Sequence, residues 1–81
     1  MKHIFGKGFV KELESLPESI QKKFWKQLTF LLKDLRHPSL HSKKYDEAKN
    51  IWQARVDQHY RFYFLINGDV YVLLSIVSHP K

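Results

Sequence analysis

The dipeptide Asn67-Gly68 is the feature that most restricts how this chain can fold. It separates two runs rich in β-branched and aromatic residues, 60–66 and 69–78. A type I′ turn needs positive φ at both central residues, so Asn-Gly between two such runs predicts a tight antiparallel hairpin. A third run of the same kind, 51–57, precedes them. The C-terminal part of the chain is therefore expected to form a three-stranded meander.

The first half of the chain has helical periodicity instead. Apolar residues recur at intervals of three and four over residues 9–16 and again over 20–35, which predicts two amphipathic helices. Ser15 and Glu18 have the spacing of a capping box, and Pro17 lies between them at a first-turn position. The second helix is therefore expected to begin at this point, and the two helices to form a hairpin.

The remaining segments complete the predicted order of elements. Residues 3–5 are a short strand candidate, and residues 36–50 have no apolar periodicity and are expected to form an exposed basic loop. A chain of 81 residues fills one core, so residues 1–81 are expected to form a single domain. The predicted fold is α+β in the order β-α-α-β-β-β, a small twisted antiparallel sheet with the helical hairpin packed on one face.

Charge and cysteine content restrict the classes of function. The chain has 14 Lys and Arg against 8 Asp and Glu, a formal net charge of +6, and no cysteine. The excess of positive charge favours a polyanionic partner, although a solvated coat of lysines is the alternative interpretation. The missing cysteines exclude disulfides and thiolate zinc sites. There is no signal-peptide pattern and no apolar run of membrane-spanning length, so a cytoplasmic protein without a membrane partner is expected.

The hairpin register predicts which residues share a face of the sheet. Counting back from a two-residue Asn67-Gly68 loop, the expected pairs are Ile66–Asp69, Phe64–Tyr71, Phe62–Leu73 and Tyr60–Ser75. If residues 58–59 form a second two-residue turn, one face collects Arg55, Tyr60, Ser75, Val77 and His79. A one-residue error in that turn would move Arg55 to the opposite face. Both faces are largely apolar, so the face without helices is expected to meet a ligand or a partner chain.

Several basic and aromatic residues have the chemistry for RNA binding and cleavage. Lys and Arg neutralise phosphates, aromatic rings stack on bases, and His transfers protons near neutral pH. When the 2′-hydroxyl of RNA attacks the neighbouring phosphate, the protein moves protons and stabilises charge, but supplies no nucleophile, metal or cofactor. The candidate residues are Lys43, Lys44, Arg55, Tyr60, Arg61, Tyr63 and His79.

Each candidate also has a purely structural interpretation. Arg61 lies among apolar neighbours, which favours a structural arginine paired with a carboxylate. The two lysines could be solvated loop charges, and His79 an ordinary surface group. His37 and His41 are four residues apart, but Pro38 between them disfavours the helix that would align them, so no metal site is expected.

Three local patterns occur in an order found in one known family. They are a His-Pro-x-Leu-x-x-Lys-Lys stretch at residues 37–44, a strand arginine followed by a Tyr-Arg pair at residues 55, 60 and 61, and a last apolar strand that ends at His79. In this order the chain resembles the RelE/ParE superfamily of toxins from bacterial type II toxin-antitoxin systems, with the RelE-like branch favoured. The resemblance implies a metal-independent endoribonuclease that cleaves mRNA on the ribosome, inhibits translation and binds a cognate antitoxin.

The resemblance also assigns roles to single residues. It implies that Lys43 and Lys44 contact RNA, that Arg55 stabilises the scissile phosphate, and that His79 occupies a basic active-site position. Tyr60 and Arg61 match the Tyr-Arg pair of the family, and both are candidates for binding RNA. The role of Arg61 is expected to be mainly structural.

One departure from the family pattern leaves alternatives open. Many RelE-like toxins continue to a further aromatic residue, whereas here the strand is followed only by Pro80 and Lys81. Either His79 acts alone, or Tyr60 or Tyr63 substitutes, or the protein is an attenuated member without catalysis. A ParE-like inhibitor of DNA gyrase that acts by protein binding is a further alternative, and a non-toxic nucleic-acid-binding domain is the last.

Overall fold

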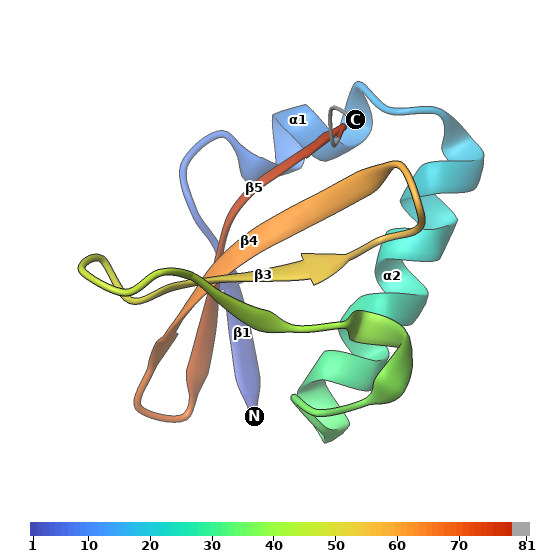
Figure 1. The fold of residues 1–81 in the computed structure, drawn as a ribbon. Coiled ribbons are helices and arrows are strands. Elements are labelled where there is room, and N and C mark those ends of the chain that lie inside the picture. Colours follow the sequence, from blue (N-terminus) through green and yellow to red (C-terminus); the bar gives the residue numbers. More distant parts are fainter. Residues whose placement is uncertain (79–81) are drawn as a thin grey trace.

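The computed structural model describes residues 1–78, which form one sheet and two main helices (Figure 1). The elements are β1 (Lys2–Phe5), α1 (Phe9–Glu14), α2 (Glu18–Lys33), a 3-10 helix (Pro38–Leu40), β2 (Lys43–Asp46), β3 (Ile51–Arg55), β4 (Tyr60–Asn67) and β5 (Val70–Ser78). The strands lie in the order β1-β5-β4-β3-β2. The predicted α+β fold with a helical hairpin is confirmed.

The main difference from the predicted elements is β2, which lies in the segment expected to be a loop. It pairs with β3 in antiparallel orientation and forms one edge of the sheet. Lys43, Lys44 and Tyr45 are all exposed, so this strand lacks the alternation of apolar and polar residues that marks a half-buried strand. At the other edge β1 runs parallel to β5, so the sheet is mixed rather than purely antiparallel.

The junction between the helices differs from a capping box. Ser15 Oγ donates a hydrogen bond to the Glu12 carbonyl at 2.6 Å, and therefore closes the end of α1 instead of capping the start of α2. Pro17 occupies the N-cap position of α2 without a side-chain hydrogen bond. The predicted start of the second helix is confirmed, but the capping box is wrong because Ser15 is engaged one turn earlier.

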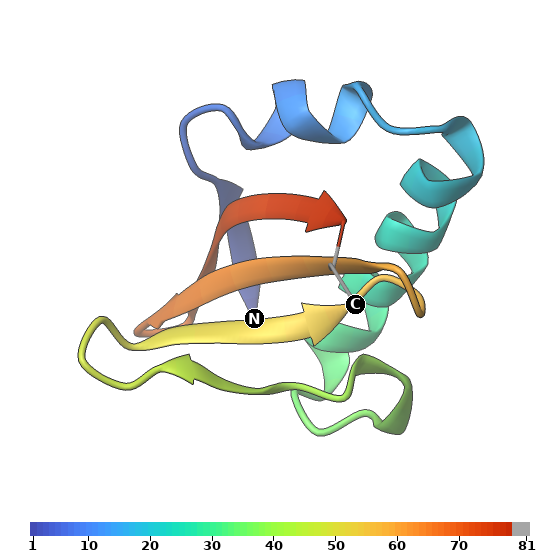
Figure 2. The ribbon, with the colours of Figure 1, turned by 45° about the horizontal axis from the view of Figure 1, so that its top comes forward.

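The core lies between the helices and one face of the sheet (Figure 2). Phe24 of α2 contacts Phe62 of β4 edge to face, with ring centroids 5.3 Å apart, and both side chains are fully buried. The other fully buried large side chains are Phe9, Leu31, Leu40, Phe64, Leu73 and Ile76. The face of the sheet that carries Phe62, Phe64, Leu73 and Ile76 is called the helix-covered face below, and the opposite side of the sheet the open face.

The β4–β5 hairpin is shifted from the expected register. Asn67 pairs with Val70, so the two turn residues are Gly68 and Asp69 rather than Asn67 and Gly68. Within this turn only Gly68 has positive φ, at 62°, which fits a type II′ turn with Gly at the first central position. The expected pairs are therefore wrong by two residues near the turn, and by three beyond the bulge described below. A shift of two keeps every side chain on its face, so Phe62, Phe64, Tyr71 and Leu73 share one face as predicted, and the structure shows that the helices cover this face.

Two one-residue irregularities place Arg55 and Ser75 on the face opposite to the one predicted. Leu74 is an extra residue in β5, and beyond this bulge Ser75 pairs with Tyr63 on the open face. The β3–β4 turn has three residues, 57–59, instead of two, so Arg55 pairs with Arg61 rather than Phe62 and also faces the open side. The two reversals leave Arg55 and Ser75 on a common face.

The predicted convergence with Tyr60 is wrong for the same reason. Tyr60 pairs with Ser78 and packs against the core, on the helix-covered face. His79, also expected in this group, lies outside the described residues.

Candidate functional site

A basic pocket of about 550 Å³ opens on the open face, over the ends of β2, β3 and β4. Its lining residues are His41, Ser42, Lys43, Tyr45, Gln53, Arg55 and Arg61. None of these residues is acidic, and neither of the ion pairs found within residues 1–78 involves a cation of the pocket. The pocket is therefore a site of uncompensated positive charge that suits an anion.

The strand register brings the cations together. Lys43 lies opposite Gln53 on the neighbouring strand, and Arg55 lies opposite Arg61. Directly opposed residues of antiparallel strands have their Cβ atoms about 5 Å apart, and like charges in this arrangement repel each other. Two adjacent guanidinium groups without a carboxylate are stabilised when an anion such as a phosphate binds between them.

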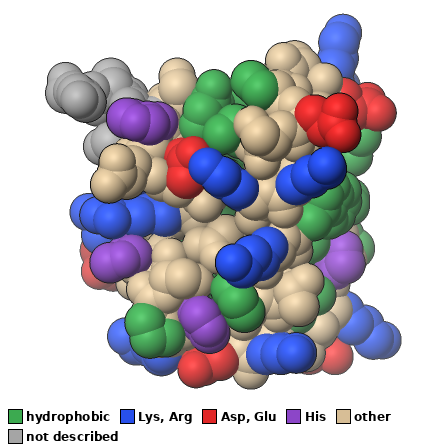
Figure 3. Space-filling model, turned by 90° about the vertical axis from the view of Figure 1, so that its right-hand side faces the viewer, with side chains coloured by type: hydrophobic (Ala, Val, Ile, Leu, Met, Phe, Trp, Pro, Cys, Tyr) green, Lys and Arg blue, Asp and Glu red, His purple; other side chains and the backbone are tan. Residues whose placement is uncertain are grey.

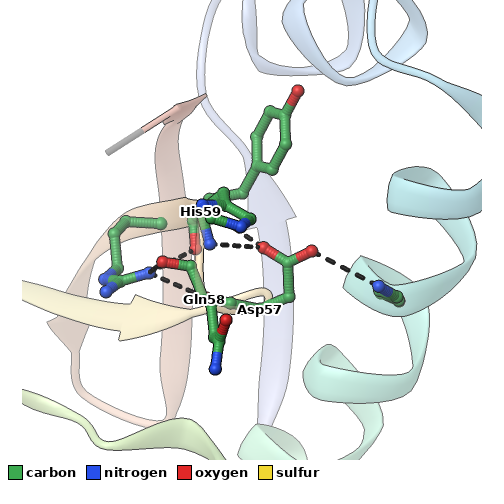
Figure 4. Close-up of polar contacts among 6 residues, drawn as sticks. Asp57, Gln58 and His59 are labelled. Carbon is green, nitrogen blue, oxygen red and sulfur yellow. Dashed lines mark hydrogen bonds and ion pairs between the residues drawn. The ribbon is translucent and has the colours of Figure 1, made fainter. Parts of the chain in front are cut away.

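Arg61 has a structural role as well as a place in the pocket. Its side chain is only 8% exposed. Nη1 donates to three backbone carbonyls of the β3–β4 turn, those of Asp57 at 2.7 Å, Tyr60 at 3.0 Å and Gln58 at 3.2 Å (Figure 4). The structural role expected for Arg61 is thus present, but its partners are carbonyl groups and not the carboxylate that was predicted.

The same turn is held from its other side by Asp57. Oδ1 accepts hydrogen bonds from the backbone N–H groups of His59 at 2.8 Å and Tyr60 at 2.9 Å, and Oδ2 lies 3.4 Å from Lys23 Nζ of α2 (Figure 4). Burial raises the pKa of the Asp57 carboxyl, but the two N–H groups and Lys23 outweigh it, so the pKa lies below its ordinary value. The turn to which Arg61 donates is thereby also attached to α2.

Gln27 of α2 supports the end of β3 from within the core. The side chain is 6% exposed, and its Nε2 donates to the carbonyls of Arg55 at 2.9 Å and Ser39 at 3.0 Å. Its Oε1 accepts from Ser39 Oγ at 3.1 Å. Sequence reasoning missed this residue. The available signal was a polar side chain beside Leu28 and one turn from Phe24, within the apolar stripe of the helix.

The structure does not bring Lys44 to the pocket with Lys43. Successive residues of a strand point to opposite faces, and Lys44 pairs with Trp52 on the helix-covered side. Its Nζ lies 5.2 Å from the centroid of the Trp52 ring, within the range of a cation–π contact. Of the predicted site residues, the structure therefore gathers Lys43, Arg55 and Arg61. It places Lys44 and Tyr60 on the other face.

Four lining residues were not among the sequence-based candidates. They are His41, Ser42, Tyr45 and Gln53. The first three lie in the segment expected to be a loop, so no register could be assigned to them. Gln53 could be placed beside the pocket only once the pairing of β3 with β2 was known. Within residues 1–78, no group of three His, Cys, Asp or Glu side chains lies close enough together to hold a metal ion.

Positive charge is also distributed over the side of the molecule formed by α2 (Figure 3). Four lysines of this helix are exposed: Lys22, Lys23, Lys26 and Lys33. Two of them are paired, because Lys22 lies 3.5 Å from Glu18 and Lys23 contacts Asp57. This side has cations interspersed with acidic and apolar groups, and therefore differs from the pocket, whose lining includes no acid.

Solved structures of small toxins share this fold. The RelE–RelB complex from Pyrococcus horikoshii OT3 matches with a TM-score of 0.81 and 20% identity over 99% of this chain and 96% of that chain. The RelB–RelE complex from Methanococcus jannaschii matches with 0.76 and 25% identity over 93% and 88%. The YoeB/ParE toxin from Agrobacterium tumefaciens matches with 0.82 and 12% identity over 99% and 100%. The fold is that of the RelE/ParE toxins.

The sequence itself identifies the family. The family model of the ParE toxin of the type II toxin-antitoxin system parDE matches residues 4–80. The chain therefore belongs to this toxin family, within the RelE/ParE superfamily. A comparison with curated protein sequences gives no significant match. Neither helix within residues 1–78 has the length and apolar character needed to cross a membrane.

Proposed function

We propose that this toxin inhibits translation by cleaving mRNA on the ribosome, without a metal or another cofactor. The observation that supports the proposal is the pocket on the open face, where Lys43, Arg55 and Arg61 lie together without a carboxylate among the lining residues. Such a cluster matches the charge of a scissile phosphate and its neighbours. ParE family membership alone does not favour RNA over another target, and the charge of this pocket is what favours RNA.

The reaction follows from the chemistry of RNA. The 2′-hydroxyl loses its proton and attacks the adjacent phosphorus, a 2′,3′-cyclic phosphate forms, and the leaving 5′-oxygen takes up a proton. Arg55 stabilises the negative charge that develops on the phosphate oxygens, and Lys43 binds a neighbouring phosphate. We assign the proton transfer to His79, on the basis of the sequence alone. Arg61 keeps the β3–β4 turn in place and adds positive charge.

A cognate antitoxin is the second proposed partner. The RelE proteins from Pyrococcus horikoshii and Methanococcus jannaschii were solved as complexes with RelB. We infer that an antitoxin covers the open face of this chain, because that face has no helix over it and carries the pocket. Bound antitoxin and RNA would then exclude each other.

The nuclease proposal is tested with ribosomes that carry a defined mRNA. Primer extension after addition of the purified toxin should show discrete new 5′ ends within the reading frame. Arg55→Ala should slow this cleavage by about 100-fold or more, the usual effect of losing a charge-stabilising group. Lys33→Ala removes an exposed cation of α2 and should leave the rate unchanged. Intact mRNA with the wild-type toxin would contradict the proposal.

Inhibition of DNA gyrase by protein binding is a second candidate function. The match to the ParE toxin family favours it. In that case the helical hairpin would be the sensitive surface, and Trp25, which is 46% exposed on α2, is its largest exposed apolar side chain. A supercoiling assay separates the two functions. Loss of gyrase activity with intact mRNA, abolished by Trp25→Ala but not by Arg55→Ala, would establish this alternative.

A further inference from the structure

A second hollow of about 420 Å³ lies beside the basic pocket on the open face. Its lining residues are Tyr45, Ile51, Tyr63, Leu74, Ser75 and Val77. The lining is mainly apolar and aromatic, with hydroxyl groups as its polar side-chain atoms. Tyr45 lines both hollows, so the basic and the apolar sites are continuous through this one side chain.

The ring of Tyr45 is exposed but supported. Lys44 pairs with Trp52 and Asp46 with Ile51, so Tyr45 is the extra residue of a β-bulge in the edge strand. Bulges of this kind turn a side chain away from the regular alternation of a strand. The side chain is 60% exposed, and its ring contacts Tyr63 at an angle of 63°, with centroids 4.8 Å apart.

Gln53 connects Tyr63, the partner of Tyr45, to the basic pocket. The Tyr63 hydroxyl accepts a hydrogen bond from Gln53 Nε2 at 3.0 Å, and Gln53 is 7% exposed and lines the pocket. One side of the Tyr45 ring is therefore held by a partner that is itself fixed, while much of the ring is open to solvent. An aromatic ring in this position, next to three cations, has the form of a stacking platform for a base.

We propose that Tyr45 and the apolar hollow form a nucleobase subsite. The base stacks on Tyr45 while the phosphate of the same nucleotide lies against Arg55 and Arg61, and Lys43 binds the neighbouring phosphate. The inference rests on the proposed binding of RNA in the basic pocket. Stacking accepts any base, because every base has a π face, and the Ser75 hydroxyl is available to the edge of the base. An apolar peptide would fill the hollow equally well, but would leave the adjoining cations without a partner.

The test compares two probes that differ by one base. One is a fluorescent 2′-O-methyl RNA trinucleotide, which cannot be cleaved because its 2′-oxygens are blocked, and the other has an abasic middle residue. Fluorescence anisotropy gives the affinity of each probe, and their ratio gives the contribution of the base. Stacking of one base corresponds to a ratio of about 5 to 150 for the wild-type toxin.

The variants separate the subsite from the basic pocket. Tyr45→Ala should reduce the ratio nearly to one without changing the affinity for the abasic probe, and Tyr45→Phe should retain the wild-type ratio. Arg55→Ala should weaken both probes and leave the ratio unchanged.

Two results would overturn the inference in different ways. An unchanged ratio in Tyr45→Ala, including the case in which this variant loses only affinity for an antitoxin, contradicts the subsite and leaves the proposed function standing. Failure of the wild-type toxin to bind either probe contradicts both the subsite and the binding of RNA in the pocket.

Discussion

The two arginines that face each other on β3 and β4 have different tasks. Arg61 is 8% exposed and donates to three carbonyls of one turn, whereas Arg55 is half-buried and has no side-chain hydrogen bond within residues 1–78. A largely buried charged donor bonded to carbonyls contributes to stability, and its removal leaves the carbonyls of Asp57 and Gln58 without this partner. A half-buried cation without such bonds contributes mainly to ligand binding.

We therefore expect opposite phenotypes for two alanine variants. Arg61→Ala should lower the free energy of unfolding by about 2–4 kcal/mol, since it removes a buried charged donor and its hydrogen bonds to three carbonyls of the β3–β4 connection. Arg55→Ala should change it by less than about 0.5 kcal/mol while it weakens the proposed binding of RNA. Urea denaturation followed by tryptophan fluorescence measures the free energy of unfolding of both variants. A stability loss in Arg55→Ala equal to that in Arg61→Ala would show that this division of roles is wrong.

At the scale of elements, the β3–β4 turn depends on its attachment to α2. Asp57 accepts two backbone hydrogen bonds and pairs with Lys23 of the helix, and these contacts keep the pKa of Asp57 below its ordinary value of 3.8. A carboxyl group with a depressed pKa in the folded state stabilises the fold at pH values above its unfolded pKa. That contribution is lost as the pH falls through the folded-state pKa.

The lowered pKa of Asp57 predicts how the stability of an Asp57→Asn variant depends on pH. Asparagine keeps an acceptor for the two N–H groups but carries no charge and does not titrate. The wild-type protein should be more stable than Asp57→Asn at pH 7, and the difference should disappear as the pH is lowered below about 3.8. Urea midpoints measured between pH 7 and pH 3 test this. A difference that stays constant over the whole range would mean that the charge of Asp57 has no part in anchoring the turn.

Elements were predictable from the sequence where one face of them is buried. The apolar stripe of α2 and the Gly68 turn are strong local signals, and both are present in the structure. Strand β2 was missed because its side chains are exposed, so no alternation marks it. The faces of Arg55 and Ser75 could not be derived, because a bulge at Leu74 and a turn one residue longer than expected leave no local signal in composition.

At the scale of the whole molecule, the proposed function requires some of the 14 basic residues to contact RNA. Exposed lysines cover the side formed by α2, but acidic groups lie among them, and two of these lysines are already paired (Figure 3). The pocket has three cations on one face. The net charge of +6 thus has a diffuse part, which attracts polyanions from any direction, and a localised part in the pocket whose charge suits a phosphate.

The salt dependence of binding measures the localised part directly. For single-stranded nucleic acid, the logarithm of the affinity falls with the logarithm of the salt concentration, with a slope of about −0.7 for each phosphate neutralised. The uncleavable trinucleotide has two phosphates between its nucleotides, so if the pocket cations neutralise both, the slope should be about −1.4. Lys43→Ala should reduce its magnitude by about 0.7, while Lys33→Ala should leave it unchanged. A slope that responds equally to both substitutions would show that the RNA follows the lysines of α2 as well as the pocket, and that the open face is only part of the binding surface.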